Sequence, residues 1–158
     1  MGLFGKRKEN KIDLKHIENK GFDLVKEVSF DNEYLILKQK LNKSAPVIKL
    51  KLDKIVGILE TTDSEIKVKG KSVLGRAVLG GVLLGPVGAI VGGVSGTTDK
   101  VKEELKFLLV INYLDSSSET QALVLEQLPG RFNLSKFAKA LKDKCNIKSE
   151  KIEDEIYL

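Results

Sequence analysis

Small residues recur at every fourth position within residues 73–96. The two series are Ala77, Gly81 and Gly85, followed by Gly88, Gly92 and Gly96. On a helix, residues four apart lie on one face, and side chains this small let a second backbone pack closely against that face. The chemistry that this spacing predicts is therefore close association between backbones, without making or breaking a bond.

Two helices joined by a tight turn are the geometry that these series predict. Gly85 and Pro86 separate them, and proline suits the first position of the second helix. Eight of the 14 glycines lie between Gly75 and Gly96, and each costs a helix about 1 kcal/mol relative to alanine. Such helices persist only where close packing or lipid compensates. The segment resembles the glycine zippers of membrane-associated and pore-forming proteins.

The length and the flanks of this glycine segment favour a hairpin. Residues 73–94 carry a single charge, Arg76. One continuous helix of this length would measure about 33 Å and could span a bilayer core of about 30 Å. Each arm of a hairpin would measure roughly 17 Å and would dip into a bilayer without crossing it. Basic residues on both sides place both ends on the cytoplasmic face. The expected headgroup contacts are Lys67, Lys69, Lys71, Arg76, Lys100 and Lys102.

Other interpretations of the glycine segment are weaker or stay open. A phosphate-binding loop needs the spacing GxxxxGK[ST]. Gly75 and Gly80 have the right separation, but Gly81 and Val82 occupy the positions of the lysine and the hydroxyl residue. Nucleotide binding is therefore not expected. A hairpin that packs in water, on its own domain or on sister subunits, stays open, because an apolar surface of this size is rarely left exposed.

Residue types that catalyse reactions or bind metals are scarce. The chain has one cysteine, Cys145, and one histidine, His16, far apart in the sequence. They leave almost no material for a zinc site or a Cys/His nucleophile, and a single cysteine excludes an internal disulfide. Isolated acids such as Asp53 and Asp115 fall at expected strand ends or turns. We therefore expect no enzyme activity, no metal and no cofactor.

The net charge of +5 comes mainly from lysine, because three arginines leave lysine as 24 of the 27 basic residues. Arginine is favoured in contacts with nucleic acids, and the lysines are not interleaved with aromatic residues. Nucleic acid is therefore not an expected partner, whereas diffuse lysine suits a solvated surface or one facing anionic lipid.

Residues 1–20 are expected to be a basic lead-in, with residues 11–20 forming a short helix or an irregular stretch.

Alternation of apolar and polar residues predicts strands both before and after the glycine segment. Asp31 and Asn32 indicate a turn between two of these strands, and Gly57 indicates a β-bulge within another. Residues 61–64 are expected to be a polar turn. The expected strands are residues 22–28, 33–38, 47–53, 54–60, 65–69, 105–114 and 120–126.

One amphipathic helix follows the last strand. Asn133 is a suitable N-cap. The apolar residues after it recur at helical spacing and are expected to form the buried face, while lysines fill the opposite face. The expected buried residues are Leu134, Phe137, Ala138, Leu141 and Cys145. The tail, residues 149–158, alternates charged and apolar residues and is expected to be loose or to add a strand.

This order of elements, strands followed by one amphipathic helix over residues 21–148, resembles the pleckstrin-homology-like (PH-like) domains of bacterial proteins. The resemblance implies an α+β fold in which a curved antiparallel sheet or small barrel is capped by a C-terminal helix. It also implies a membrane-adjacent scaffold or binding module that is not an enzyme. The chain departs from a plain domain of this kind because the glycine-rich helical hairpin, residues 73–96, is inserted into it.

These features lead to an expected function. The chain is expected to be a non-enzymatic bacterial or phage protein at the cytoplasmic face of the inner membrane. Its hairpin would mediate self-association and insertion, and a ring of hairpins would perturb permeability. The alternative is a soluble homo-oligomeric binding module that uses the hairpin as a protein interface. Besides a second copy of the chain, anionic membrane lipid is the expected partner, and no protein partner follows from the sequence.

Overall fold

The computed structural model describes residues 10–17, 24–69, 78–79, 82–83 and 105–147. The helices are the 3-10 helix η1 (Leu52–Lys54), α1 (Asp63–Lys69) and α3 (Leu134–Lys144). The strands are β1 (Lys11–His16), β2 (Leu24–Phe30), β3 (Tyr34–Gln39), β4 (Ile48–Lys51), β5 (Ile55–Thr62), β6 (Val78–Leu79), β7 (Val82–Leu83), β8 (Phe107–Leu114) and β9 (Thr120–Gln127).

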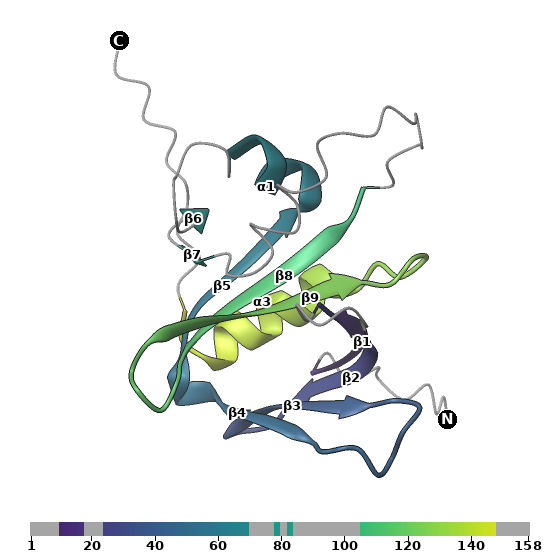
Figure 1. Cartoon of the computed structure of the whole chain (residues 1–158), viewed down its shortest axis with the longest axis vertical. Helices are drawn as coiled ribbons and strands as arrows, with labels where there is room; N and C mark the ends of the chain where they lie inside the picture. Colours follow the sequence, from purple (N-terminus) through teal and green to yellow (C-terminus); the bar gives the residue numbers. More distant parts are fainter. Residues whose placement is uncertain (1–9, 18–23, 70–77, 80–81, 84–104, 148–158) are drawn as a thin grey trace, which may run out of the picture.

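Seven of these strands form one antiparallel sheet in the order β4-β3-β2-β1-β9-β8-β5. β1 joins the two halves, because it pairs with β2 along its whole length and with β9 from Leu14 to His16. The sheet curves strongly, and α3 lies across its concave side (Figure 1). The predicted α+β architecture, a curved antiparallel sheet capped by a C-terminal helix, is confirmed.

Strand β1 corrects the prediction for the start of the chain. The expected helix or irregular stretch is wrong over Lys11–His16, which pairs with β2 through six residues. Ile12, Leu14 and His16 are buried and alternate with less buried polar residues, as a strand with one core-facing side requires. The lysines that made this segment look like a basic lead-in lie on the other face, where Lys11 Nζ is 3.0 Å from Glu27 Oε2.

The structure confirms most of the other strands within a few residues and corrects one. A register shift between Ile55 and Gly57 confirms the bulge in β5. The strand expected over residues 65–69 is wrong, because these residues belong to helix α1. The polar turn expected over residues 61–64 is also wrong, since β5 continues to Thr62 and α1 begins at Asp63.

The turn between β2 and β3 is held by the carboxylate of Asp31. Its Oδ1 accepts the backbone N–H groups of Glu33 and Tyr34, both at 2.8 Å. These hydrogen bonds stabilise the charged form and hold the pKa of Asp31 below its ordinary value. Ionised Asp31 therefore stabilises this turn.

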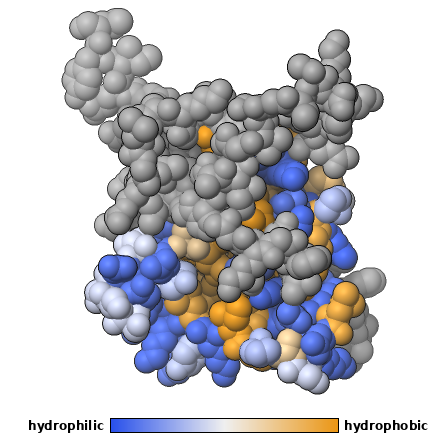
Figure 2. Space-filling model, in the orientation of Figure 1, coloured by the Kyte–Doolittle hydropathy of each residue, from blue (hydrophilic) through white to orange (hydrophobic). Residues whose placement is uncertain are grey.

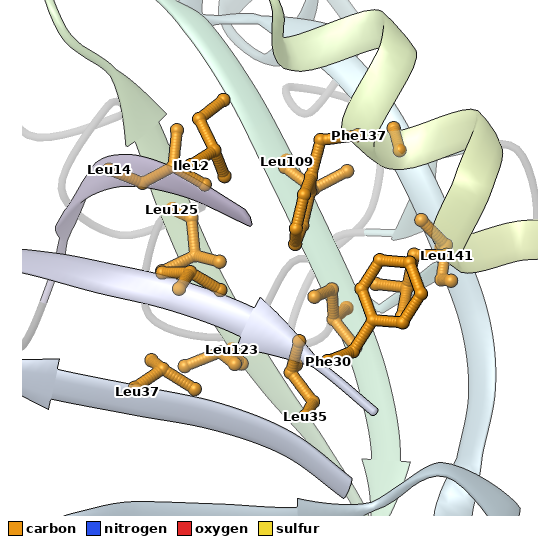
Figure 3. Packing of buried hydrophobic residues seen from close by; sticks show 14 of the residues in the cluster. Ile12, Leu14, Phe30, Leu35, Leu37, Leu109, Leu123, Leu125, Phe137 and Leu141 are labelled. Atoms are coloured by element: carbon orange, nitrogen blue, oxygen red, sulfur yellow. The ribbon is translucent and has the colours of Figure 1, made fainter. Parts of the chain in front are cut away.

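The main hydrophobic core lies between α3 and the concave side of the sheet. Leu134, Phe137, Ala138 and Leu141 are buried as predicted. Figure 3 shows Phe137 and Leu141 directed from α3 toward the strands. The rings of Phe137 and Phe30 meet edge to face, with centroids 5.5 Å apart, a favoured arrangement for aromatic pairs. This contact fixes the helix on the sheet.

The two ends of α3 also follow the sequence prediction in part. Asn133 holds the N-cap position, where its carbonyl accepts the N–H of Phe137 at 3.1 Å, but its side chain forms no capping hydrogen bond. Cys145 is half-buried at the C-cap and packs against the main core, so the expected full burial is only partly met. This partial burial raises the pKa of the Cys145 thiol and keeps it protonated.

Replacing Phe137 with alanine should lower the free energy of unfolding by about 3–5 kcal/mol, because the ring fills the centre of the main core. Chemical denaturation would measure the change. Lys136→Ala is the matched control, since Lys136 is an exposed neighbour on the same helix, and it should leave the midpoint nearly unchanged. Equal midpoints for the two variants would contradict the packing of α3.

Replacing Asp31 with asparagine should destabilise the fold at neutral pH and have progressively less effect as the pH falls. The folded pKa of Asp31 lies below its unfolded value, so its contribution is fully present above the unfolded pKa of about 3.9. That contribution is lost as the pH falls through the folded pKa. Denaturation of both proteins between neutral pH and pH ~2 tests this, and a constant difference in stability would contradict it.

Candidate functional site

The glycine segment is the part of the chain that sequence analysis singles out, and little of it lies in the described residues. Lys67 and Lys69, two expected headgroup contacts, lie in the second half of α1. The remaining predicted site residues lie outside the described residues: Lys71, Arg76, Ala77, Gly81, Gly85, Gly88, Gly92, Gly96, Lys100 and Lys102. The described part of the site consists of the elements that carry and contact this segment.

The insertion between β5 and β8 is fastened, by which we mean that its two ends are joined by strand pairing and hydrogen bonds. Thr62, the last residue of β5, pairs with Phe107, the first residue of β8. One step further out, the Asp63 N–H donates to the Lys106 carbonyl at 3.1 Å, and the Lys106 N–H donates to Asp63 Oδ1 at 3.1 Å. The chain therefore leaves the sheet and returns to it at one place.

Helix α1 begins with a reciprocal pair of hydrogen bonds that sequence analysis missed. The Glu65 N–H donates to Thr62 Oγ1 at 3.2 Å, while Glu65 Oε2 accepts the Thr62 N–H at 3.4 Å and the Thr61 hydroxyl at 2.8 Å. This is a capping box, whose signature is Ser or Thr followed three residues later by Glu or Gln. The signal was present in the sequence as Thr62 and Glu65.

The face of β8 and β9 that points away from α3 is also apolar. Five consecutive residues of β8, from Leu108 to Asn112, are buried, and continuous burial means that both faces of a strand are covered. On the outer side, Leu108, Val110 and Val124 form a second cluster with Ile66 of α1. We call these four residues the outer cluster.

Strand β7, within the glycine segment, lies against the same part of the sheet. It contacts β5, β8 and β9, and α1 and the β6–β7 pair lie together at one end of the molecule (Figure 1). At β7, the glycine segment therefore packs against the sheet of its own domain.

The predicted first helix of the hairpin is wrong over the four residues that the structure describes there. Val78 pairs with Leu83 and Leu79 with Val82 in an antiparallel ladder. This register leaves a connection of two residues, and the sequence there is Gly-Gly, a composition that tight hairpins favour. The β-branched side chains of the valines and the low helix propensity of glycine also favour strands over a helix here. The second helix, after Pro86, lies outside the described residues.

The described residues limit the chemistry of the site in two ways. They contain no group of three or more His, Cys, Asp or Glu side chains placed to hold a metal ion. None of the helices that the structure describes is both long enough and apolar enough to cross a membrane. The described part of the site therefore consists of an apolar face, its cover and the fastened ends of the insertion.

Replacing Ile66 with alanine should cost about 2–5 kcal/mol in the free energy of unfolding, because this buried side chain joins α1 to the outer cluster. Ser64→Ala is the matched control, since Ser64 is exposed on the same helix. Denaturant titrations of the two variants provide the measurement. If Ile66→Ala behaved like the control, α1 would not be part of the cover of this face.

Comparison with known families adds one finding. A family model described as a glycine zipper containing PH domain matches residues 11–125. The match begins at β1 and extends through the glycine segment into β9. It thus covers both the joining strand that sequence analysis had placed in the lead-in and the fastened insertion. A search of the curated proteins found no match.

Proposed function

This chain belongs to the family of PH domains that contain a glycine zipper, and we propose that it is a non-enzymatic, membrane-associated protein. In this proposal the curved sheet with α3 is a folded base at the cytoplasmic face of the membrane. The glycine segment enters the lipid and associates with the same segment of other copies. A bacterial or phage origin and effects on permeability belong to the same proposal.

The observation that carries this proposal is the fastening of the two ends of the insertion. The backbone pair between Asp63 and Lys106 holds both ends at one place beside the sheet. A segment that starts and ends at one place can enter a bilayer from one side and return to it, which a single crossing helix does not allow. This geometry supports a hairpin that dips into lipid.

The second glycine series is the better candidate for self-association. A helix face through Ala77, Gly81 and Gly85 conflicts with the strands β6 and β7. Gly88 and Gly92 follow Pro86 in the sequence and lie outside the described residues, so none of the described strands includes them. We therefore assign the close backbone contact between copies to the series that continues to Gly96.

Basic residues at both ends of the insertion support contact with anionic lipid. Lys67 and Lys69 lie in the last turn of α1, and the sequence adds Lys71 and Arg76 before the apolar stretch and Lys100 and Lys102 after it. Each such charge near an anionic membrane surface contributes about 1 kcal/mol of attraction. In the proposal these residues hold the base of the hairpin at the headgroups.

Replacing Gly88 and Gly92 together with leucine should lower the size of the oligomer, because leucine pushes the neighbouring backbone away. The same change raises hydrophobicity, so partitioning into lipid should persist or increase. Cross-linking and light scattering of the full chain would measure the oligomer. The control is Val87→Leu/Val91→Leu, which should have little effect. If both pairs behave alike, the glycines are not an interface.

A second candidate function is favoured by the position of β7. Because β7 contacts β5, β8 and β9 of its own domain, the chain is also suited to be a soluble homo-oligomeric binding module. In that case the glycine segment packs on protein and not in lipid. Co-sedimentation of the full chain with vesicles of mixed phosphatidylcholine and phosphatidylserine separates the two candidates, since the soluble module stays in the supernatant.

A further inference from the structure

The two edge strands of the seven-stranded sheet differ in how they are protected against further pairing. β4 has only four residues, and its Lys49 and Lys51 are exposed. A short strand and exposed lysines are common protection for a sheet edge. β5 has eight residues, and its first charged residue is Glu60, near its C-terminal end. β5 is therefore the edge that its own residues protect less.

One side of β5 has no strand beside it in the described part of the chain. β5 pairs with β8 along its other side, and it ends the strand order of the sheet. β7 contacts β5, but it also contacts β8 and β9, so it lies over the face of these strands and not along the edge. The unpaired N–H and C=O groups of an edge strand readily bond to an additional strand. We call this side of β5 the open edge.

Apolar side chains lie on the strand that has the open edge. Val56, in the bulge of β5, is 50% exposed, and Leu59 is only partly buried against the outer cluster. Figure 2 shows orange apolar surface between blue hydrophilic side chains in several places, so exposure alone does not distinguish Val56. What distinguishes it is the strand that carries it, because a further strand at the open edge would cover apolar surface as well as pair with the backbone.

A groove of about 920 Å³ lies between β5 and α3. Glu60 lines it from β5, and Lys139 and Lys142 are among the residues that line it from one face of α3. Glu60 is already engaged, since its Oε2 accepts the Ser135 hydroxyl at 2.7 Å and its Oε1 lies 3.8 Å from Lys142 Nζ. The lining charges balance, because Asp143 also lines the groove. Lys139 nevertheless forms no ion pair with the described residues, so it is available to an acidic segment.

The chain continues from this groove into an acidic segment. Ile147 lines the groove, and residues 149–158, with the sequence SEKIEDEIYL, follow shortly after it and lie outside the described residues. We call residues 149–158 the acidic tail. It holds four acidic residues and one basic residue, whereas the other 148 residues hold 18 acidic and 26 basic residues. An acidic tail on an otherwise basic chain is attracted to its own domain.

The residue pattern of the acidic tail fits a strand at a sheet edge. Ile152 and Ile156 share one side of an extended chain, and Glu153 and Glu155 share the other. Asp154 is a charged residue on the apolar side. Extended residues advance about 3.3 Å each, so the ten residues of the tail are long enough to follow the eight residues of β5 from end to end.

We propose that the acidic tail is an additional strand on the open edge of β5. Neighbouring strands share the same two faces of a sheet, so Ile152 and Ile156 continue the face that carries Leu59. Glu153 and Glu155 fall on the face of the α3 groove. By occupying the open edge, the tail keeps a second copy of the chain from pairing there. The inference stands without the function proposed above, since it involves no residue of the glycine segment.

Amide hydrogen exchange of the full chain, followed residue by residue by NMR, tests the pairing. In the unaltered chain, the amides of β5 that do not bond to β8 should exchange slowly. Ile152→Asp/Ile156→Asp should accelerate their exchange about tenfold, because aspartate opposes burial beside Leu59. The amides on the unpaired side of β4, the other edge strand, are the internal control and should keep their rates.

Charge reversal tests where the acidic side chains of the tail lie. Lys139→Glu should accelerate exchange of the same β5 amides about threefold. Lys136→Glu is the matched control, because Lys136 belongs to α3 but does not line the groove, and it should leave the rates unchanged. Adding Glu153→Lys or Glu155→Lys to Lys139→Glu should restore slow exchange in one of the two combinations, which identifies the residue that faces Lys139.

Four results would overturn the inference. Fast exchange of these β5 amides in the unaltered chain, or no response to Ile152→Asp/Ile156→Asp, would show that the tail leaves the edge open. Protection that depends on protein concentration would assign the edge to a second copy. An equal acceleration in all seven strands would show that the tail acts on the whole fold. Equal effects of Lys139→Glu and Lys136→Glu would place the acidic side chains away from the groove.

Discussion

Burial of β8 on both faces is the constraint on which the rest of the structure depends. Leu109 and Ile111 point into the main core, while Leu108 and Val110 point to the opposite side. One helix cannot cover both faces. α3 covers the concave face, so the outer face needs a cover of its own, which α1 and β7 supply in the described part of the chain. The insertion between β5 and β8 is therefore tied to the stability of the sheet as well as to what the segment binds.

The fastening of the insertion follows from the same constraint. β5 and β8 pair up to Thr62 and Phe107, and the capping box then turns the chain into α1 at once. This turn places Ile66 over the outer face within a few residues of the strand end. In the proposed function, this short connection from the sheet suits a segment that meets a copy of itself in a defined orientation.

The sequence predicted the elements whose pattern has a single interpretation. The face of α3 and the strands β8 and β9 were predicted because long periodic or apolar runs leave little ambiguity. Residues 65–69 alternate as a strand would, yet they form a helix, since the local capping box prevails over a short period-2 pattern. β1 was missed because its lysines suggested a solvated tail, and because one of its two partners, β9, lies far away in the sequence. Small-residue spacing alone did not predict that Gly80 and Gly81 separate two paired strands.

The outer cluster also limits how the glycine segment can act. Exposing Leu108, Val110 and Val124 would cost roughly 5–9 kcal/mol at about 1.5–3 kcal/mol for each side chain, which is comparable to the whole stability of a small domain. Ile66 of α1 covers part of this face, so a segment whose β7 left it without a replacement would lose part of that amount. In the proposed function, insertion into lipid would therefore leave β7 on the sheet, or a second apolar surface would take its place. The first case would confine the proposed membrane entry and self-association to the chain beyond β7, where the second glycine series lies in the sequence.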